Sequence, residues 1–296
     1  MTASASKTLK KNAIAYSFIL PNLLGFAAFT LVPMVFALAL SFMSWDGANP
    51  IAFAGIKNFA RMLRDDAIRI STFNTLYFVA GTVPATLAAS LGLALLLNKN
   101  LKGRNVFRSI FFFPYVASLV AVAVVWNMMF HPAMGPVNNL LRALGVAEPP
   151  RWAASTKWVM PTVIMASVWK NVGYYLVIYL AALQGIPREL YEAARIDGAG
   201  AWTSFRRITL PLLTPATFFV TMMLTISSFK VFDLIYVMTA GGPGRSSNVL
   251  VFTIYDSAFI SFDYGYSSAI ALVLFFLVLG ITLIQFRMEK KWVSYL

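Results

Sequence analysis

The sequence predicts an all-α, polytopic membrane protein with six transmembrane helices, and three observations lead to this fold class. Of the 296 residues, 59% are hydrophobic and only 12% are charged, whereas a soluble domain carries about a quarter charged residues. The mean hydropathy is +0.72. Several uninterrupted apolar runs reach the roughly twenty residues that a helix needs to cross a bilayer. These runs are apolar on every face, which disfavours a soluble all-helical core.

Six apolar segments follow one another along the chain. The first, residues 13–43, contains no charge. Because it is about twice as long as the apolar core of a signal peptide, we expect an uncleaved helix that Pro21 and Pro33 kink or tilt. The remaining expected spans are 74–97, 109–130, 159–183, 212–238 and 267–286. The domain organisation that follows is a cytoplasmic tail over 1–12, one transmembrane domain over 13–288 and a second cytoplasmic tail over 289–296.

The charges of the loops predict the orientation of the chain. Six spans place the N-terminus, residues 98–108, residues 184–211 and the C-terminal tail on one side, with fourteen basic and four acidic residues. The loops of the other side carry eight basic and six acidic residues. Since basic loops stay in the cytoplasm, both termini and the stretch 184–211 are expected there.

Several kinds of chemistry are excluded or disfavoured. The chain has no cysteine and one histidine, His131, so disulfides and thiolate sites are excluded and no metal site is predicted. No phosphate-binding G-x-x-x-x-G-K-[ST] sequence and no Ser/His/Asp constellation occur. The glycine-rich stretch Gly241–Gly244 is interpreted as a turn that stops the fifth helix. The basic residues flank apolar segments instead of forming a stripe, which disfavours nucleic acid as a partner. We predict no catalytic residues.

The polar stretch 184–211 is the most distinctive feature of the sequence. Pro187 favours the start of a short helix, and Gly198 and Gly200 permit a sharp turn after it. A second helix is expected over 201–208, and Pro211 is expected to separate it from the fifth span. The alanines of the first helix leave room for a partner surface to approach closely. The alternative interpretation is a solvated amphipathic loop.

The spacing within this stretch resembles the EAA loop of the inner-membrane permease subunits of ATP-binding-cassette (ABC) importers. The pattern is Glu192-Ala193-Ala194, two residues, Asp197-Gly198-Ala199, eight residues, Ile208, one residue, Leu210-Pro211. The resemblance implies a type I ABC importer permease whose loop is a cytoplasmic coupling helix that docks into a groove on a separate ATPase. It assigns the contact to Glu192, close packing and the turn to Ala193, Ala194 and Gly198, and the lead into the next span to Leu210 and Pro211. Asp197 and Ile208 are further residues of the coupling motif.

Other motifs narrow the resemblance to the carbohydrate-uptake branch of that family. They are Ala182-Leu183-Gln184-Gly185-Ile186-Pro187, Thr239-Ala240-Gly241-Gly242-Pro243 and Gln285-Phe286-Arg287…Lys291-Trp292-Val293. The chain is maltose-permease-like but lacks the extra N-terminal spans and the large periplasmic domain, so a six-span relative of the multiple-sugar or glycerol-phosphate type fits better. The resemblance implies a bacterial inner-membrane location, two ATPase subunits that hold ATP and magnesium, a second homologous permease and an extracytoplasmic solute-binding protein. It implies no cofactor in this chain.

Polar residues within the spans are candidates for the solute path, because polar groups at that depth face protein or water. They are Lys170, Asn171, Tyr174 and Tyr175 in the fourth span and Ser228, Lys230 and Asp233 in the fifth. The resemblance to the maltose permease places Asn171, Tyr174 and Lys230 at a central sugar cavity. Alternatives remain for each. Lys230 and Asp233, three residues apart, could form a pair on one helix face, and the other residues could have packing roles.

The function that these features predict is the permease subunit of an ATP-driven importer for a sugar or sugar-like solute. A secondary carrier or channel without an ATPase is the alternative. It is disfavoured because Asp233 is the only acidic residue within a predicted span, whereas proton-coupled carriers usually keep several ionisable groups there. A membrane enzyme would need a polar catalytic cluster that the sequence does not contain. Lys170 and Lys230 hint at an anionic sugar, but the sequence does not name the solute.

Overall fold

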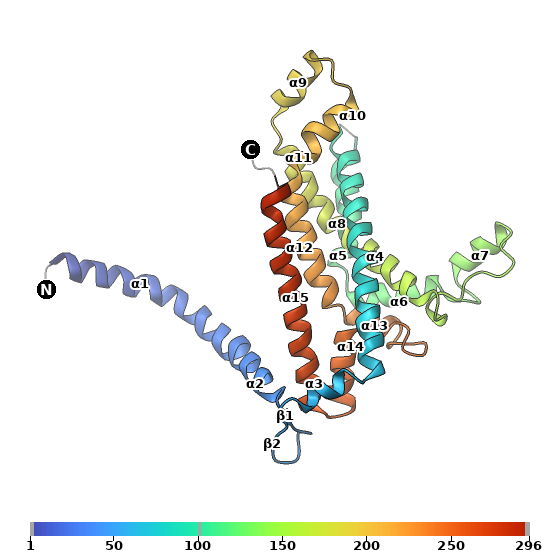
Figure 1. The fold of residues 1–296 in the computed structure, drawn as a ribbon. Coiled ribbons are helices and arrows are strands. Elements are labelled where there is room, and N and C mark those ends of the chain that lie inside the picture. The colour runs from blue at the N-terminus through green and yellow to red at the C-terminus, as the bar shows by residue number, and fades with distance from the viewer. Residues whose placement is uncertain (1–2, 100–101, 294–296) are drawn as a thin grey trace. The chain divides into compact units, whose positions relative to one another are not determined.

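The protein is almost wholly helical in its computed structural model, which describes residues 3–99 and 102–293 (Figure 1). Residues 1–2 and 294–296 of the expected tails and residues 100–101 of the basic loop lie outside the described residues. Four helices are long and apolar enough to cross a membrane, and there are up to six spans if each of two bent helix pairs counts as one. The predicted all-helical, polytopic membrane fold is confirmed.

Short helices and two very short strands connect the long helices. The helical elements in chain order are α1 (Ala3–Phe26), η1 (Ala27–Leu31), α2 (Val32–Leu40), α3 (Lys57–Met62), α4 (Asp66–Leu97), α5 (Arg104–Val116), α6 (Leu119–Met129), α7 (Pro136–Ala143), η2 (Trp152–Ala154), α8 (Val159–Gln184), α9 (Arg188–Ile196), α10 (Ala201–Ser204), η3 (Phe205–Thr209), α11 (Leu210–Leu212), α12 (Thr214–Phe229), α13 (Asp233–Met238), α14 (Leu250–Tyr255), η4 (Asp256–Ile260) and α15 (Tyr264–Trp292). The strands β1 (Met43–Ser44) and β2 (Ala52–Phe53) pair antiparallel.

The described chain divides into two compact units, of which the first contains the residues up to Arg64 and Ile254–Val273. Its first span is continuous through α1, η1 and α2. The π-helical turn η1 ends two residues before Pro33, where the missing N–H of proline disturbs the regular hydrogen bonding.

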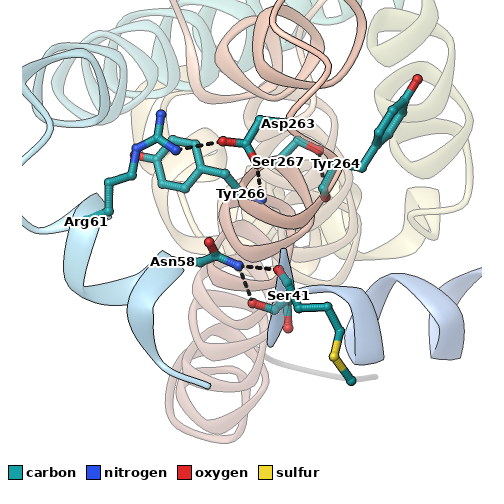
Figure 2. Close-up of polar contacts among 8 residues, drawn as sticks. Ser41, Asn58, Arg61, Asp263, Tyr264, Tyr266 and Ser267 are labelled. Atoms are coloured by element: carbon teal, nitrogen blue, oxygen red, sulfur yellow. Dashed lines mark hydrogen bonds and ion pairs between the residues drawn. The ribbon is translucent and has the colours of Figure 1, made fainter. Parts of the chain in front are cut away.

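Polar contacts join α3 to the start of α15 and to the chain around β1 (Figure 2). The Nδ2 group of Asn58 donates to the carbonyl oxygens of Ser41 at 3.0 Å and Met43 at 2.8 Å. The guanidinium of Arg61 lies 2.6 Å from the carboxylate of Asp263 and 3.9 Å from the ring centroid of Tyr266. These contacts give this short polar segment a defined conformation.

The second unit contains Asp65–Thr253 and the chain from Leu274 onward. In it, α4 packs against α8 and α12, α5 packs against α8, and α6 packs against α13. α4 begins at Asp66, earlier than the predicted residue 74, because the carboxylate of Asp65 caps it by accepting the N–H of Ala67. Figure 1 shows α9 and α10 beyond one end of the long helices of this unit, and α13 toward the other end.

Helices α5 and α8 cross in close contact at Gly173. A Cβ atom at this position would lie 1.8 Å from the carbonyl oxygen of Phe111. Only glycine therefore permits the backbones to approach this closely. The two helices run antiparallel, since Lys170 on α8 contacts Tyr115 near the end of α5, while Gly173, further along α8, lies against Phe111, earlier on α5.

Two of the predicted spans are broken. The third, expected to be continuous over 109–130, bends by 99° between α5 and α6. The fifth is interrupted between α12 and α13, where Phe232 has φ −139° and ψ −61°. Pro211 was expected to separate the coupling stretch from the fifth span, but the helix continues through it and bends by 61° after Leu212. Pro215 in the first turn of α12 favours a new start there.

The glycine-rich stretch after α13 is a turn, as predicted. Gly241 and Gly244 have φ values of +78° and +56°, which L side chains rarely adopt. The Nδ2 group of Asn74 on α4 holds the following loop by donating to the carbonyl oxygens of Arg245 at 3.0 Å and Asn248 at 2.9 Å.

The Gly173 crossing yields a test of the fold. We expect Gly173→Ala to destabilise the protein by about 1–3 kcal/mol, since overpacking at a tight contact forces the backbones apart. Gly92→Ala is the matched control, because a Cβ at this helical position on α4 would meet nothing within 4 Å. Thermal unfolding of the purified protein measures both. Equal melting temperatures for the two variants would contradict the importance of the crossing.

Candidate functional site

A polar pocket lies between the broken spans of the second unit. Its volume is about 190 Å³. It brings together five of the seven residues predicted for the solute path and adds others from α4, α6 and the α12–α13 break. The lining residues are Phe78, Leu119, Ser167, Lys170, Asn171, Ser227, Ser228, Lys230, Val231, Phe232, Asp233 and Leu234. The structure thus joins the polar groups of the fourth and fifth spans in one place.

Lys170 has a structural partner that the sequence did not reveal. Its ammonium donates to the carbonyl oxygens of Pro114 at 3.4 Å and Tyr115 at 2.9 Å, in the last turn of α5. The bend after α5 leaves these carbonyls without helical N–H partners. A cation at the carbonyl end of a helix also interacts favourably with the helix dipole. Lys170 therefore stabilises the broken third span at the edge of the pocket.

Of the other predicted residues of α8, Asn171 lines the pocket, whereas Tyr174 and Tyr175 pack against other side chains. The Nδ2 group of Asn171 donates to the carbonyl oxygen of Ser167 at 2.8 Å, which fixes its amide toward the pocket. Tyr174 and Tyr175 are not among the lining residues. Tyr174 stacks on Tyr115 with ring centroids 4.4 Å apart, and Tyr175 is buried in the helical core. The alternative interpretation of the two tyrosines as interior packing fits this placement.

Lys230 and Asp233 do not form the helical pair that their spacing allowed. α12 ends at Phe229, Lys230 caps it, the next two residues lie outside the helices, and Asp233 begins α13. Within the described part of the chain, no ion pair joins them, and both side chains are exposed at the pocket. The signal that could have indicated the break is weak. Several Ser and Thr side chains of α12, among them Thr221 and Ser227, donate to carbonyls of the preceding turn, which often bends helices.

The coupling stretch folds as a helix, a tight turn and a second helix, as predicted. α9 begins directly after Pro187. Its end is closed by hydrogen bonds from the N–H of Gly198 to Arg195 and of Ala199 to Ala194, and Gly198 has φ +78°. This is the left-handed cap that favours glycine. In place of one regular second helix, α10 leads into the π-helical turn η3.

The surface of α9 is open to a partner. Glu192, Ala193 and Asp197 are exposed, and Ala194 is half-buried. No salt bridge among the described residues involves the acidic side chains of this stretch. The apolar side chains of Ile196 and Trp202 are 87% and 70% exposed. An isolated surface with unpaired carboxylates and exposed apolar groups has the composition of a docking site.

The remaining residues of the stretch attach it to the helical core. The hydroxyl groups of Tyr191 and Thr209 are 2.9 Å apart and hydrogen-bonded. Ile208 packs against the core, where Leu213 is fully buried. Leu210 is partly exposed and Pro211 half-buried. These contacts join the coupling stretch to the helical core close to the start of α12.

These features define a class of protein. A helical membrane protein with a polar pocket between its spans and an exposed charged helix at one end has the features of a transport subunit with a docking surface for another chain. The chain belongs to the family of binding-protein-dependent transport system inner membrane components, which matches residues 81–293.

Relatives along nearly the whole chain agree with this assignment. The chain is 36% identical over 98% of its length to the probable ABC transporter permease protein YesP of Bacillus subtilis, of which it covers 95%. It is 35% identical over 95% of its length to the sn-glycerol-3-phosphate transport system permease protein UgpA of Yersinia pestis, of which it covers 96%. A crystal structure of a bacterial ABC transporter involved in the import of the acidic polysaccharide alginate matches with a TM-score of 0.86 and 25% identity over 98% of this chain and 100% of that one.

The predicted type I ABC importer permease fold and the function as an importer permease subunit are thereby confirmed. The chain is an inner-membrane transport subunit that works with a solute-binding protein, and it is not an enzyme. ATP hydrolysis belongs to a separate chain. The alternative of a secondary carrier or channel finds no support.

The contact of Lys170 with α5 predicts that Lys170 contributes more to the stability of the protein than Lys230, the other lysine of the pocket. We expect Lys170→Met to destabilise the protein by about 1–3 kcal/mol, because two carbonyl groups at the end of α5 lose their donor. Lys230→Met, which removes a side chain without such contacts in the described structure, is expected to leave the melting temperature nearly unchanged. Lys170→Arg, which keeps the donors, should recover part of the loss. The same melting temperature for both methionine variants would refute this role of Lys170.

Proposed function

We propose that the chain carries a sugar or sugar-like solute through the polar pocket. The observation that carries this proposal is the pocket itself, in which amide, hydroxyl, ammonium and carboxylate groups lie beside the aromatic side chains of Phe78 and Phe232. Hydrogen-bonding groups next to apolar and aromatic surfaces are the usual means of fixing a small ligand. The sn-glycerol-3-phosphate permease and the alginate transporter among the similar proteins support this solute class.

The energy for transport comes, in this proposal, from two ATPase subunits that hold ATP and magnesium at the cytoplasmic face. One of them binds α9 through Glu192, with Ala193 and Ala194 allowing close approach. The unpaired carboxylates and the exposed Ile196 and Trp202 support this docking surface. The hydrogen bond of Tyr191 and the packing of Ile208 give the route by which ATPase closure moves α12.

A second, homologous permease completes the solute path. The pocket of about 190 Å³ is small for a sugar, since ligand pockets measure roughly 300–1,000 Å³. Lys230 and Asp233 are exposed in the isolated chain, although polar groups at membrane depth face protein or water. A facing subunit would enlarge the pocket and enclose both side chains. Both termini lie in the cytoplasm in this arrangement, as the charges of the loops predict.

The coupling role can be tested with two glutamates of the same helix. We expect Glu192→Ala to reduce ATP-dependent uptake at least tenfold and to weaken the copurification of the ATPase, because a charged contact buried at an interface is lost. Glu189→Ala, an equally exposed position one turn earlier, is the matched control and should keep near-normal uptake. Normal uptake and ATPase retention in the Glu192 variant would overturn the assignment.

The solute path is tested separately from coupling. Asn171→Leu and Asp233→Asn are expected to change the uptake kinetics several-fold while the ATPase remains bound, since both alter the polar lining of the pocket. Asn98→Leu, an exposed asparagine at the end of α4, is the control. Unaltered uptake of the transported solute in both pocket variants would place the path elsewhere.

A further inference from the structure

A second concave surface lies between α5 and α8 and shares no residue with the polar pocket. It measures about 480 Å³. It is lined by Asn105, Arg108, Ser109, Phe112 and Val177. The four residues of α5 are spaced three, one and three apart, so they form one face of that helix. We call this surface the α5–α8 groove.

The antiparallel crossing places the groove near one membrane surface. Val177 precedes the end of α8 at Gln184 by seven residues, or roughly 10 Å at 1.5 Å per residue. The coupling stretch follows directly after that end. The polar end of the groove at Asn105 and Arg108 therefore lies on the side of α9, which the charges of the loops assign to the cytoplasm.

The charge at the polar end is positive and without compensation. Arg108 makes no hydrogen bond or ion pair among the described residues. Lys99, Lys102 and Arg104 are close to it in the chain, and no acidic residue occurs between Asp66 and Glu148. A bound anion would offset the mutual repulsion of these cations.

The rest of the groove lining is apolar. Phe112 and Val177 supply it, and the neighbouring face of α5 exposes Val106, Ile110 and Phe113. The surface thus combines a cationic, hydrogen-bonding mouth at the depth of the headgroups with an apolar continuation along the span. We propose that the α5–α8 groove binds an anionic phospholipid of the cytoplasmic leaflet, its phosphate at Arg108 and its acyl chains along Phe112 and Val177.

The test compares phosphatidylglycerol with phosphatidylcholine in nanodiscs that contain the assembled importer. Lipid that stays bound after detergent extraction is counted by native mass spectrometry. We expect phosphatidylglycerol to be retained by the wild type and phosphatidylcholine not. Arg108→Gln should weaken this retention about fivefold. Val177→Trp, which fills the apolar part of the groove and leaves the charge in place, should abolish the retention of phosphatidylglycerol. Arg287→Gln is the control, because it removes an exposed arginine near the C-terminal end of α15, which the charges of the loops also assign to the cytoplasmic side. This variant should retain the lipid.

Three results would overturn the proposal. The first is equal retention of phosphatidylglycerol by Arg108→Gln and the wild type. The second is displacement of the lipid by inorganic phosphate, which would indicate an anion site that does not use the apolar surface. The third concerns a protein occupant. Because the chain has no cysteine, Asn105→Cys provides a single thiol, and its cross-linking to another subunit would show that the groove is a subunit interface.

Discussion

The polar interior of this permease depends on which groups form hydrogen bonds with the carbonyls that are freed where the third span is broken. Hydrocarbon offers no hydrogen bonds, so a span can bend by 99° only if protein groups take up the freed carbonyls. The ammonium of Lys170 does this for Pro114 and Tyr115, and the bare backbone of Gly173 brings α8 close enough for it to reach them. The carbonyl end of α5 thus stabilises the charged ammonium of Lys170 within the membrane-spanning part of α8. The same contact leaves α6 free to turn toward α13, with which it packs.

The coupling stretch follows the opposite principle. It is attached to the core by few contacts, chiefly the hydrogen bond between Tyr191 and Thr209 and the packing of Ile208, while most of its side chains are exposed. Moving such a segment costs little free energy because few contacts are broken, while these contacts still define where it is attached. In our proposal, an ATPase subunit that moves α9 acts through this attachment on the bend after Leu212 and on the start of α12. α12 ends at Phe229, directly before Lys230 in the polar pocket. One helix would therefore connect the coupling stretch to the site that the solute occupies in our proposal.

The sequence predicted those features that depend on composition and on single special residues. Uninterrupted apolarity located the six segments, and Gly198 located the tight turn because its φ of +78° favours glycine. The helix breaks were not predictable in the same way. No glycine or proline marks Ala117–Ser118 or Lys230–Phe232, and these breaks are stabilised by tertiary contacts such as that of Lys170. The alternative of a pair between Lys230 and Asp233 is not formed among the described residues for this reason, since a spacing of three implies a shared face only within an unbroken helix.

The composition of the pocket also limits which groups can act on a solute. Lys170 donates to two carbonyls and Asn171 donates to Ser167, so part of the donor capacity predicted from the sequence is already used inside the protein. Lys230 and Asp233 have no such partners in the described chain and stand at the break between α12 and α13. In our proposal the coupling stretch displaces α12, and Lys230, which directly follows that helix, moves with it. The recognition of the solute and the movement that releases it would then share the same helix end, so tight binding in one position need not persist in the other.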